Sequence, residues 1–166
     1  MTYLKERRPE TINQGFGPDL TVSGNAHVNH DQFHDGGGSA RFDGTEPFDS
    51  ISIQPAANEF DFGEGAFTIE AWVRFDAPGQ FFTIASKFDE NQSPRGWVFA
   101  GGDNYLRLYD QNGSADFTVD TDDRFQTGRW YQVAAVREGN TLRFFRDGIQ
   151  QGPDRGVTNR SFNGAA

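Results

Sequence analysis

Residues 66–76, which read AFTIEAWVRFD, decide the fold class of this chain. Apolar and polar residues alternate along the stretch, which is the pattern of a β-strand with one buried face. The positions on the predicted buried face are Phe67, Ile69, Ala71, Val73 and Phe75. The opposite face places Trp72 between Glu70 and Arg74. We expect that face to be either a packing cluster or a platform for a ligand.

Similar short runs, separated by turn residues, recur through the rest of the chain. They lie at residues 20–23, 39–43, 50–54, 81–87, 96–100, 105–109, 117–119, 128–137, 141–146 and 149–151. Asn112-Gly113 and Asp147-Gly148 favour tight hairpins, because these residue types tolerate positive φ. No helical periodicity interrupts the runs. The sequence therefore predicts an all-β fold, an antiparallel sandwich or jelly roll.

The composition indicates a globular protein with large core side chains. The chain has 166 residues and 17 Phe, which is enough to bury a core although it contains no Cys. Its net charge of −9 argues against nucleic acid as the main partner, because phosphate recognition needs clustered Lys and Arg. No apolar stretch approaches the length of a membrane span, and the first ten residues lack the apolar core of a secretion signal. We expect neither nucleic-acid binding nor membrane insertion.

The amino-terminal part differs in composition from the rest of the chain. Asn, Gly, Asp and His dominate residues 1–38, and periodicity is weak there. We therefore predict an extended arm or loop over residues 1–38 and a β-domain over residues 39–166. The strand pattern ends after Gly152, so the sheet is expected to lack its last strands. An uncovered sheet edge would invite pairing, which favours assembly with another subunit.

The three histidines of the chain lie close together in the predicted arm. They are His27, His30 and His34, with Asp31 and Asp35 beside them. Imidazole and carboxylate groups are common ligands of transition metals. The surrounding Asn, Gly and Asp residues favour a polar loop over a helix that would align the three rings. The sequence is compatible with both a metal site and a simple polar loop.

Four motifs lie in a characteristic order along the β-domain. They are GSARFDG at residues 38–44, FTIEAWVR at residues 67–74, GRWYQVAAVR at residues 128–137 and LRFFRDG at residues 142–148. Together they resemble the laminin-G-like, concanavalin A-like lectin/glucanase jelly rolls. The resemblance covers residues 38–152 and implies a jelly-roll β-sandwich. It implies little about function, because that fold hosts lectins, adhesion modules, glycosidases and virion proteins.

The segment EFDFGE, residues 59–64, suggests catalysis through this resemblance. It matches the E-x-D-x-x-E pattern of the family's retaining β-glucanases, in which two glutamates are the nucleophile and the acid/base. Retaining hydrolysis needs two carboxyl groups about 5–5.5 Å apart. However, the glycines at 63 and 65 predict a turn before the strand at Phe67. We therefore expect Glu59, Asp61 and Glu64 to be solvated turn residues and the protein to be non-catalytic.

Two acidic loops are candidate calcium sites. The candidate ligands are Asp110, Asn112, Asp116 and Asp122, on loops that we expect to be neighbours. Carboxylate and amide oxygens suit calcium, and the resemblance implies that such domains often hold one at their rim. The same residue types also form ordinary solvated turns, so both interpretations stay open.

The exposed face of the strand at residues 66–76 is the candidate binding platform. We expect it to lie on the concave side of the sandwich and to combine Glu70, Trp72 and Arg74 with Tyr105, Arg107 and Tyr109. Aromatic side chains with charged neighbours suit stacking on a sugar or contact with a protein. The alternative is that Trp72, Trp97 and Trp130 are large packing residues.

These features lead to a ranked set of functional hypotheses. The first is a non-catalytic phage virion protein on the virion surface, which decorates a capsid or tail. It would contact other subunits, including copies of itself, and glycans. The second is a carbohydrate-binding module of a larger secreted, extracellular protein. The third is a β-glucanase-like glycoside hydrolase.

Overall fold

A computed structural model of the chain describes residues 20–45, 49–54, 59–77, 79, 81–88, 96–110 and 115–163. These residues contain twelve strands and no helix, and therefore no helix that could cross a membrane. The chain divides into two compact units, residues 1–56 and residues 57–166. The boundary that we predicted after residue 38 stays a prediction.

The first unit contains two small antiparallel strand pairs. They are β1 (Leu20–Ser23) with β4 (Ser50–Ile53), and β2 (His27–Asn29) with β3 (Ser39–Arg41). β1, β3 and β4 lie where the alternating runs predicted them. β2 was not predicted, because three residues are too few to show a period of two. The segment that we expected to be an extended arm thus contains paired strands from Leu20 onward.

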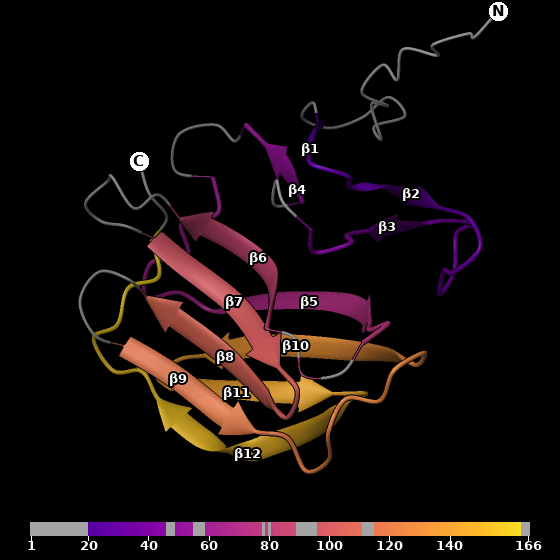
Figure 1. The fold of residues 1–166 in the computed structure, drawn as a ribbon. Helices are drawn as coiled ribbons and strands as arrows, with labels where there is room; N and C mark the ends of the chain where they lie inside the picture. Colours follow the sequence, from indigo (N-terminus) through magenta and orange to yellow (C-terminus); the bar gives the residue numbers. More distant parts are fainter. Residues whose placement is uncertain are drawn as a thin grey trace, which may run out of the picture. The chain divides into compact units, whose positions relative to one another are not determined.

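The second unit is built from two four-stranded antiparallel sheets (Figure 1). The β5 sheet has the order β12-β11-β10-β5, with β5 (Phe67–Arg74), β10 (Trp130–Glu138), β11 (Thr141–Arg146) and β12 (Ile149–Gly156). The β8 sheet has the order β6-β7-β8-β9, with β6 (Phe82–Phe88), β7 (Gly96–Gly102), β8 (Tyr105–Asp110) and β9 (Ala115–Asp120). The predicted all-β antiparallel sandwich is confirmed.

Large aromatic and aliphatic side chains fill the space between the two sheets. Phe99 of β7 and Phe144 of β11 face each other across it, with ring centroids 6.3 Å apart, and both are completely buried. The other fully buried apolar residues of this core are Leu106, Leu108, Val133, Ala135, Leu142, Val157 and Phe162. Few but large side chains therefore make the core, as the 17 Phe in the sequence indicated.

β5 shows the alternation from which its fold was predicted. Phe67 is buried, and Ile69 and Val73 pack against the core, whereas Glu70 and Trp72 are exposed. β10 lies beside β5 in antiparallel register, with Val133 opposite Ala71. A shift of the β5–β10 register by one residue would turn the apolar side chains of β5 to the outside. Burial of these side chains therefore determines the register.

The hairpin between β11 and β12 has the predicted turn. Asp147 and Gly148 both adopt positive φ, at 52° and 76°, which two-residue hairpins of type I′ require. β12 continues to Gly156 and is longer than the run at residues 149–151 that we predicted. Its polar composition concealed the extension, since IQQGPDRG has no alternating apolar residues.

The carboxyl-terminal segment is tied to the sheets by one buried guanidinium. Arg137 of β10 is only 1% exposed, and it donates to the carbonyl oxygens of Gly63 (3.2 Å), Gly139 (3.0 Å) and Arg160 (2.6 Å). Its guanidinium also lies 5.6 Å from the ring centroid of Phe162. Backbone carbonyls thus replace the carboxylate that a buried cation usually needs.

Candidate functional site

The outer face of the β5 sheet presents an exposed indole among polar groups. Trp72 is 44% exposed, and Gln132 lies opposite it on β10. The Gln132 amide donates to Glu70 Oε2 over 3.4 Å. Trp130 is the diagonal neighbour of Trp72 on the same face and is half-buried. We call this surface the Trp72 face. Its side chains project from β5 and β10, whose opposite side packs on the core.

A shallow hollow of about 190 Å³ lies on the Trp72 face. It is lined by Thr68, Glu70, Gln132, Ala134, Val136, Phe145 and Gly148. The hollow thus combines apolar side chains with a carboxylate and an amide from neighbouring strands. Such a mixture can bind a ligand through both contact and hydrogen bonds.

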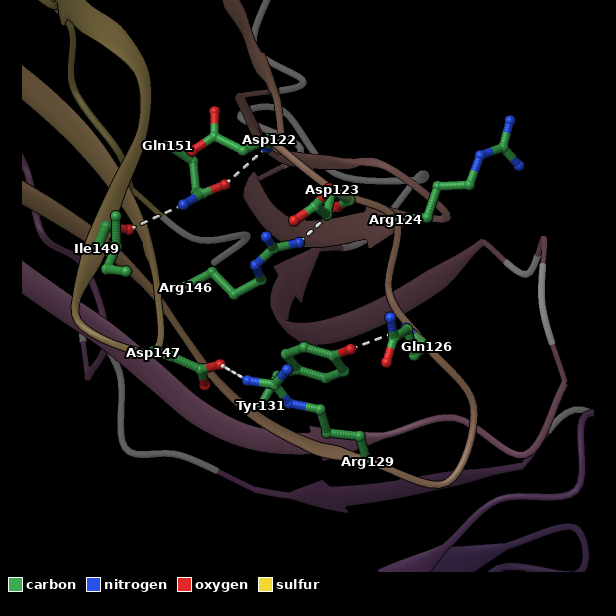
Figure 2. A pocket seen from close by; sticks show the side chains of 10 residues that line it. All are labelled: Asp122, Asp123, Arg124, Gln126, Arg129, Tyr131, Arg146, Asp147, Ile149 and Gln151. Carbon is green, nitrogen blue, oxygen red and sulfur yellow. Dashed lines mark hydrogen bonds and ion pairs between the residues drawn. The ribbon is translucent and has the colours of Figure 1, made fainter.

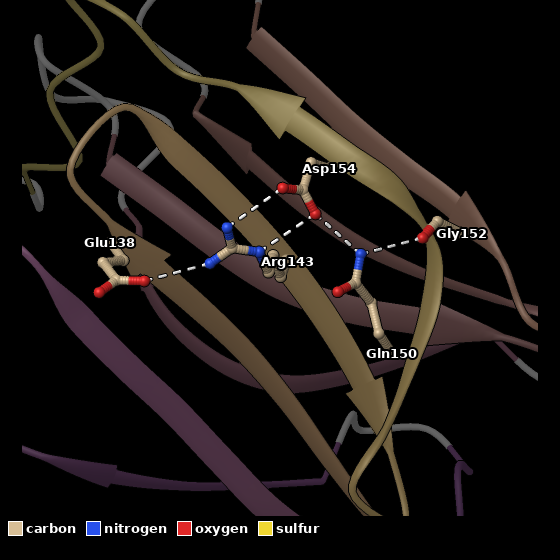
Figure 3. A network of polar contacts seen from close by, with 5 residues as sticks. All are labelled: Glu138, Arg143, Gln150, Gly152 and Asp154. Carbon is tan, nitrogen blue, oxygen red and sulfur yellow. Dashed lines mark hydrogen bonds and ion pairs between the residues drawn. The ribbon is translucent and has the colours of Figure 1, made fainter.

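Farther along the same face, charged residues of β11 and β12 neutralise one another. Figure 3 shows Arg143 between Glu138 and Asp154, and Gln150 bound to the same aspartate. Hydrogen bonds from Arg143 and then from Gln150 hold the pKa of Asp154 below its usual value. This end of the face is a closed network of ion pairs, so it offers less to a ligand than the hollow beside it.

Tyr105, Arg107 and Tyr109 do not join the Trp72 face, and this expectation was wrong. They belong to β8, and the alternating Leu106 and Leu108 point into the core with no exposure. The β8 sheet and the β5 sheet turn their inner faces toward one core, so outward side chains on the two sheets lie on opposite surfaces of the sandwich. Sequence alternation gave the orientation of each strand but not the sheet to which it belongs.

On β8, Arg107 forms a two-bond ion pair with Asp116. Its Nε and Nη2 donate to the two oxygens of Asp116 over 2.8 and 2.6 Å, and its guanidinium lies 4.4 Å from the Tyr109 ring centroid. Partial burial favours a higher pKa for Asp116, but the hydrogen bonds from Arg107 and Thr118 and the positive charge of Arg107 outweigh it. The pKa of Asp116 is therefore below normal.

The predicted calcium ligands do not come together around one ion. Asp116 lies at the β8–β9 hairpin end, opposite Tyr109, whereas Asp122 follows the other end of β9. About six strand residues, or roughly 20 Å, separate the two positions. Asp110 is at the hairpin end, and Asn112 lies outside the described residues. The described parts of the chain contain no group of three acidic or histidine side chains that could hold a metal ion. Calcium at a smaller subset of these ligands stays a prediction.

The histidines of the first unit bind neighbouring backbone groups. Nδ1 of His27 lies 2.8 Å from the carbonyl oxygen of Asn25, and Nδ1 of His30 lies 2.8 Å from that of Gly37. His27 is in β2, and His34 follows in the β2–β3 connection, so no helix aligns the three rings. The two bonds orient the His27 and His30 rings separately, and His34 Nδ1 lies 3.4 Å from Oδ2 of Asp35.

The glucanase-like pattern lies in the turn before β5, as the glycines predicted. Asp61 accepts a 2.9 Å bond from Lys87 Nζ, and Glu59 and Glu64 are exposed. The turn is held by a backbone bond of 2.9 Å from Phe62 to Phe162. The three carboxylates therefore lie on a structural turn and not on a strand that lines a groove. The non-catalytic assignment itself stays a prediction.

The three tryptophans have different environments. Trp97 is 4% exposed and donates its Nε1–H to the Phe60 carbonyl over 3.0 Å, so it is a packing residue. Phe60, whose carbonyl accepts this bond, is 43% exposed and has a φ of 63°. Phe62 does anchor the core, since its ring stacks 4.5 Å from that of Phe67.

A second concavity lies at one end of the sandwich and was not predicted from the sequence. Its lining residues are Asp122, Asp123, Arg124, Gln126, Arg129, Tyr131, Arg146, Asp147, Ile149 and Gln151 (Figure 2). They come from the β9–β10 connection, β10 and the β11–β12 hairpin. The feature of the sequence that points to this concavity is the repeated occurrence of Arg near Asp in an acidic chain. Only the pairing of β10 with β11 brings these segments together.

Comparison with known protein families agrees with this architecture. The laminin-G-type family model described as "Concanavalin A-like lectin/glucanases superfamily" matches residues 43–166, about three quarters of the chain. The chain belongs to this superfamily. A search of curated proteins finds no match.

Membership of the concanavalin A-like superfamily supports a module that binds carbohydrate or protein. The superfamily name covers glucanases as well as lectins. Function must therefore be argued from the surface of this particular member. Within the described residues of the second unit, the Trp72 face and the concavity of Figure 2 both combine apolar and polar side chains around a hollow.

Proposed function

We propose that this concanavalin A-like protein is a non-catalytic module that binds glycans through the Trp72 face. The observation that carries the proposal is the 44% exposed indole of Trp72, next to a hollow lined by both apolar and polar side chains. One face of a pyranose ring presents C–H groups that pack on aromatic rings, whereas its hydroxyls need donors and acceptors. Glu70 and Gln132 supply both kinds of group within the same hollow.

The strand scaffold supports this proposal because it keeps the platform rigid. Trp72 and Gln132 are opposite each other in the β5–β10 register, and their inward neighbours Ala71 and Val133 belong to the packed side. A ligand would therefore meet side chains whose backbone does not need to be ordered on binding. Preorganised groups lose less entropy and bind more strongly.

The test is a glycan array followed by calorimetry with Trp72→Ala. We expect the wild type to bind at least one neutral glycan, and the substitution to weaken that binding about tenfold or more, as for a central aromatic contact. Tyr105→Ala removes an aromatic residue from the opposite surface and serves as the matched control. Equal affinities of the wild type and Trp72→Ala, with the fold intact by circular dichroism, would contradict the proposal.

The edge of the β5 sheet supports a second, compatible function in assembly. Within the described parts of the chain, β5 pairs on one side only, with β10, so the other edge of an eight-residue strand is open. Open edges favour pairing with another chain. We propose on this basis that the module functions as a surface component of a virion, in contact with other subunits or with its own copies.

Sedimentation and immunolabelling test this assembly role. We expect concentration-dependent self-association in analytical ultracentrifugation and labelling of phage capsids or tails by an antibody raised against the protein. A strictly monomeric protein at high concentration, together with unlabelled particles from the phage that encodes it, would refute this role and leave glycan binding unaffected.

A further inference from the structure

The concavity at the end of the sandwich, which we call the Arg146 pocket, has the size and chemistry of a ligand site. Its volume is about 300 Å³, at the lower end of the roughly 300–1,000 Å³ found for small-molecule pockets. Figure 2 shows Asp122, Asp123 and Arg124 on one side and Arg129 and Tyr131 on the other, with Arg146 between them. Three arginines line the pocket, of which Arg124 points away from its centre and has a side chain that is 76% exposed.

Two of the three arginines already have carboxylate partners. Arg124 pairs with Asp103, and Arg129 Nη2 donates to Asp147 over 2.9 Å. The guanidinium of Arg146 instead donates one bond from Nη1 to the carbonyl oxygen of Asp123. Among the described residues, no carboxylate lies within ion-pair distance of Arg146. Arg146 therefore keeps a full positive charge and further N–H donors for a ligand.

The surrounding aromatic rings hold this guanidinium in place. Its central carbon lies 5.5 Å from the ring centroid of Phe125 and 5.8 Å from that of Tyr131. Tyr131 is itself only 3% exposed, and its hydroxyl accepts a 2.8 Å bond from the backbone N–H of Gln126. Arg146 is consequently preorganised, since the rings and the Asp123 carbonyl limit its rotamers without neutralising its charge.

The remaining walls suit hydroxyl groups and one apolar ring face. The exposed carboxylates of Asp122 and Asp123 are acceptors for hydroxyl groups. Ile149, which is 64% exposed, is the apolar part of the rim. The same two carboxylates would repel a doubly charged phosphate, whereas a single planar carboxylate matches the fork of one arginine.

We propose that the Arg146 pocket binds an acidic sugar residue, with the sugar carboxylate on Arg146 and its hydroxyls toward Asp122 and Asp123. This site is separate from the Trp72 face and is independent of the glycan binding proposed there. The class of ligand follows from one unpaired, immobilised cation beside hydroxyl acceptors in a space of monosaccharide size.

The test titrates the intact protein with methyl glycosides of glucuronate, galacturonate and N-acetylneuraminate, with neutral methyl glucoside and galactoside for comparison. Binding is followed by calorimetry or by ligand-observed NMR. At least one acidic glycoside should bind, and its neutral counterpart at least tenfold more weakly. Arg146→Gln should weaken the acidic ligand roughly ten- to a hundred-fold, because one charge-assisted contact is lost.

Two control variants separate this site from other effects. Arg143→Gln removes a guanidinium from the outward face of the same strand, and Arg107→Gln removes one from the outer face of the other sheet; both should leave acidic-sugar affinity unchanged. Failure of all three acidic glycosides to bind would overturn the proposal. So would equal binding of the neutral sugars, or an affinity insensitive to Arg146→Gln in a variant with wild-type melting temperature. If no sugar binds but a Glu-rich peptide binds in a way that depends on Arg146, the ligand is a protein. That result would also overturn the proposal.

Discussion

Single arginines of this protein have different roles because their partners differ. Arg137 is buried against backbone carbonyls, Arg107 forms a two-bond pair with Asp116, and Arg146 has no carboxylate partner among the described residues. Arg137 contributes to the fold, and Arg107 stabilises one surface. Arg146 keeps a positive charge that no carboxylate of the described residues pairs with. A sequence shows the same residue type in all three cases.

The Arg107–Asp116 pair predicts a dependence of stability on pH. The folded-state pKa of Asp116 is lowered, so the pair stabilises the fold fully above the unfolded-state pKa of about 3.9. This contribution is lost as the pH falls from there through the folded pKa. Asp116→Asn should therefore lower the urea midpoint at pH 7, and the difference from the wild type should shrink as the pH falls below about 4.

Denaturation curves from pH 7 down to pH 3 measure this dependence. Glu70→Gln, which changes an exposed carboxylate on the other sheet, is the control and should show little change at any of these pH values. A destabilisation by Asp116→Asn that stays constant down to the lowest pH would mean that lost packing, and not the ion pair, causes it.

The inner and outer faces of a single strand of the sandwich have different roles. β5 buries Phe67 and packs Ile69 against the core, and it exposes Trp72 on its outer face. β10 does the same, with Val133 inside and Gln132 outside, and it adds Arg137 as an anchor for the carboxyl-terminal segment. Substitutions on the two faces of one strand should therefore affect stability and binding separately.

Removal of the Arg137 anchor should destabilise the second unit. In Arg137→Met the side-chain volume is largely kept, but the carbonyls of Gly63, Gly139 and Arg160 lose the guanidinium as a donor. The Gly63 carbonyl keeps the N–H of Phe162 as a donor, and Gly139 and Arg160 are exposed residues whose carbonyls water can reach. We therefore expect the loss of these charge-assisted hydrogen bonds to lower the free energy of unfolding by about 1–3 kcal/mol. Chemical denaturation measures it, and hydrogen exchange should show faster opening near Val157.

Arg143→Met is the control for this anchor. Arg143 lies on the outer face of β11 in exposed ion pairs with Glu138 and Asp154, which contribute little to stability. Its loss should therefore cost much less than the loss of Arg137. Equal effects of the two substitutions would show that Arg137 does not anchor the segment.

The whole molecule consists of two units with unequal cores. Nearly all fully buried apolar residues belong to residues 57–166, and Ala26 is the buried apolar residue described in the first unit. The second unit contains both sheets and both proposed surfaces. The second unit therefore has its own hydrophobic core, which a domain needs in order to fold alone.

Residues 57–166 should fold without the first unit. We expect a single cooperative thermal transition and β-type circular dichroism for this fragment, because its core contacts are internal to it. Calorimetry of the fragment and of the full chain tests the prediction. An unfolded or molten fragment would show that the first unit supplies part of the core.

The sequence by itself determined the fold class and most strands of this protein. Alternation identified β5 and β10, and Asp147-Gly148 identified a hairpin, because period two and positive φ are local properties of the chain. Alternation also placed Trp72 on the outer face of its strand, but nothing in the sequence showed that Trp97 is buried. The tertiary structure decided which strands share a sheet. It separated Trp72 from Tyr105, separated Asp116 from Asp122, and brought Arg146 to Arg129, because strand pairing joins positions that the sequence cannot relate.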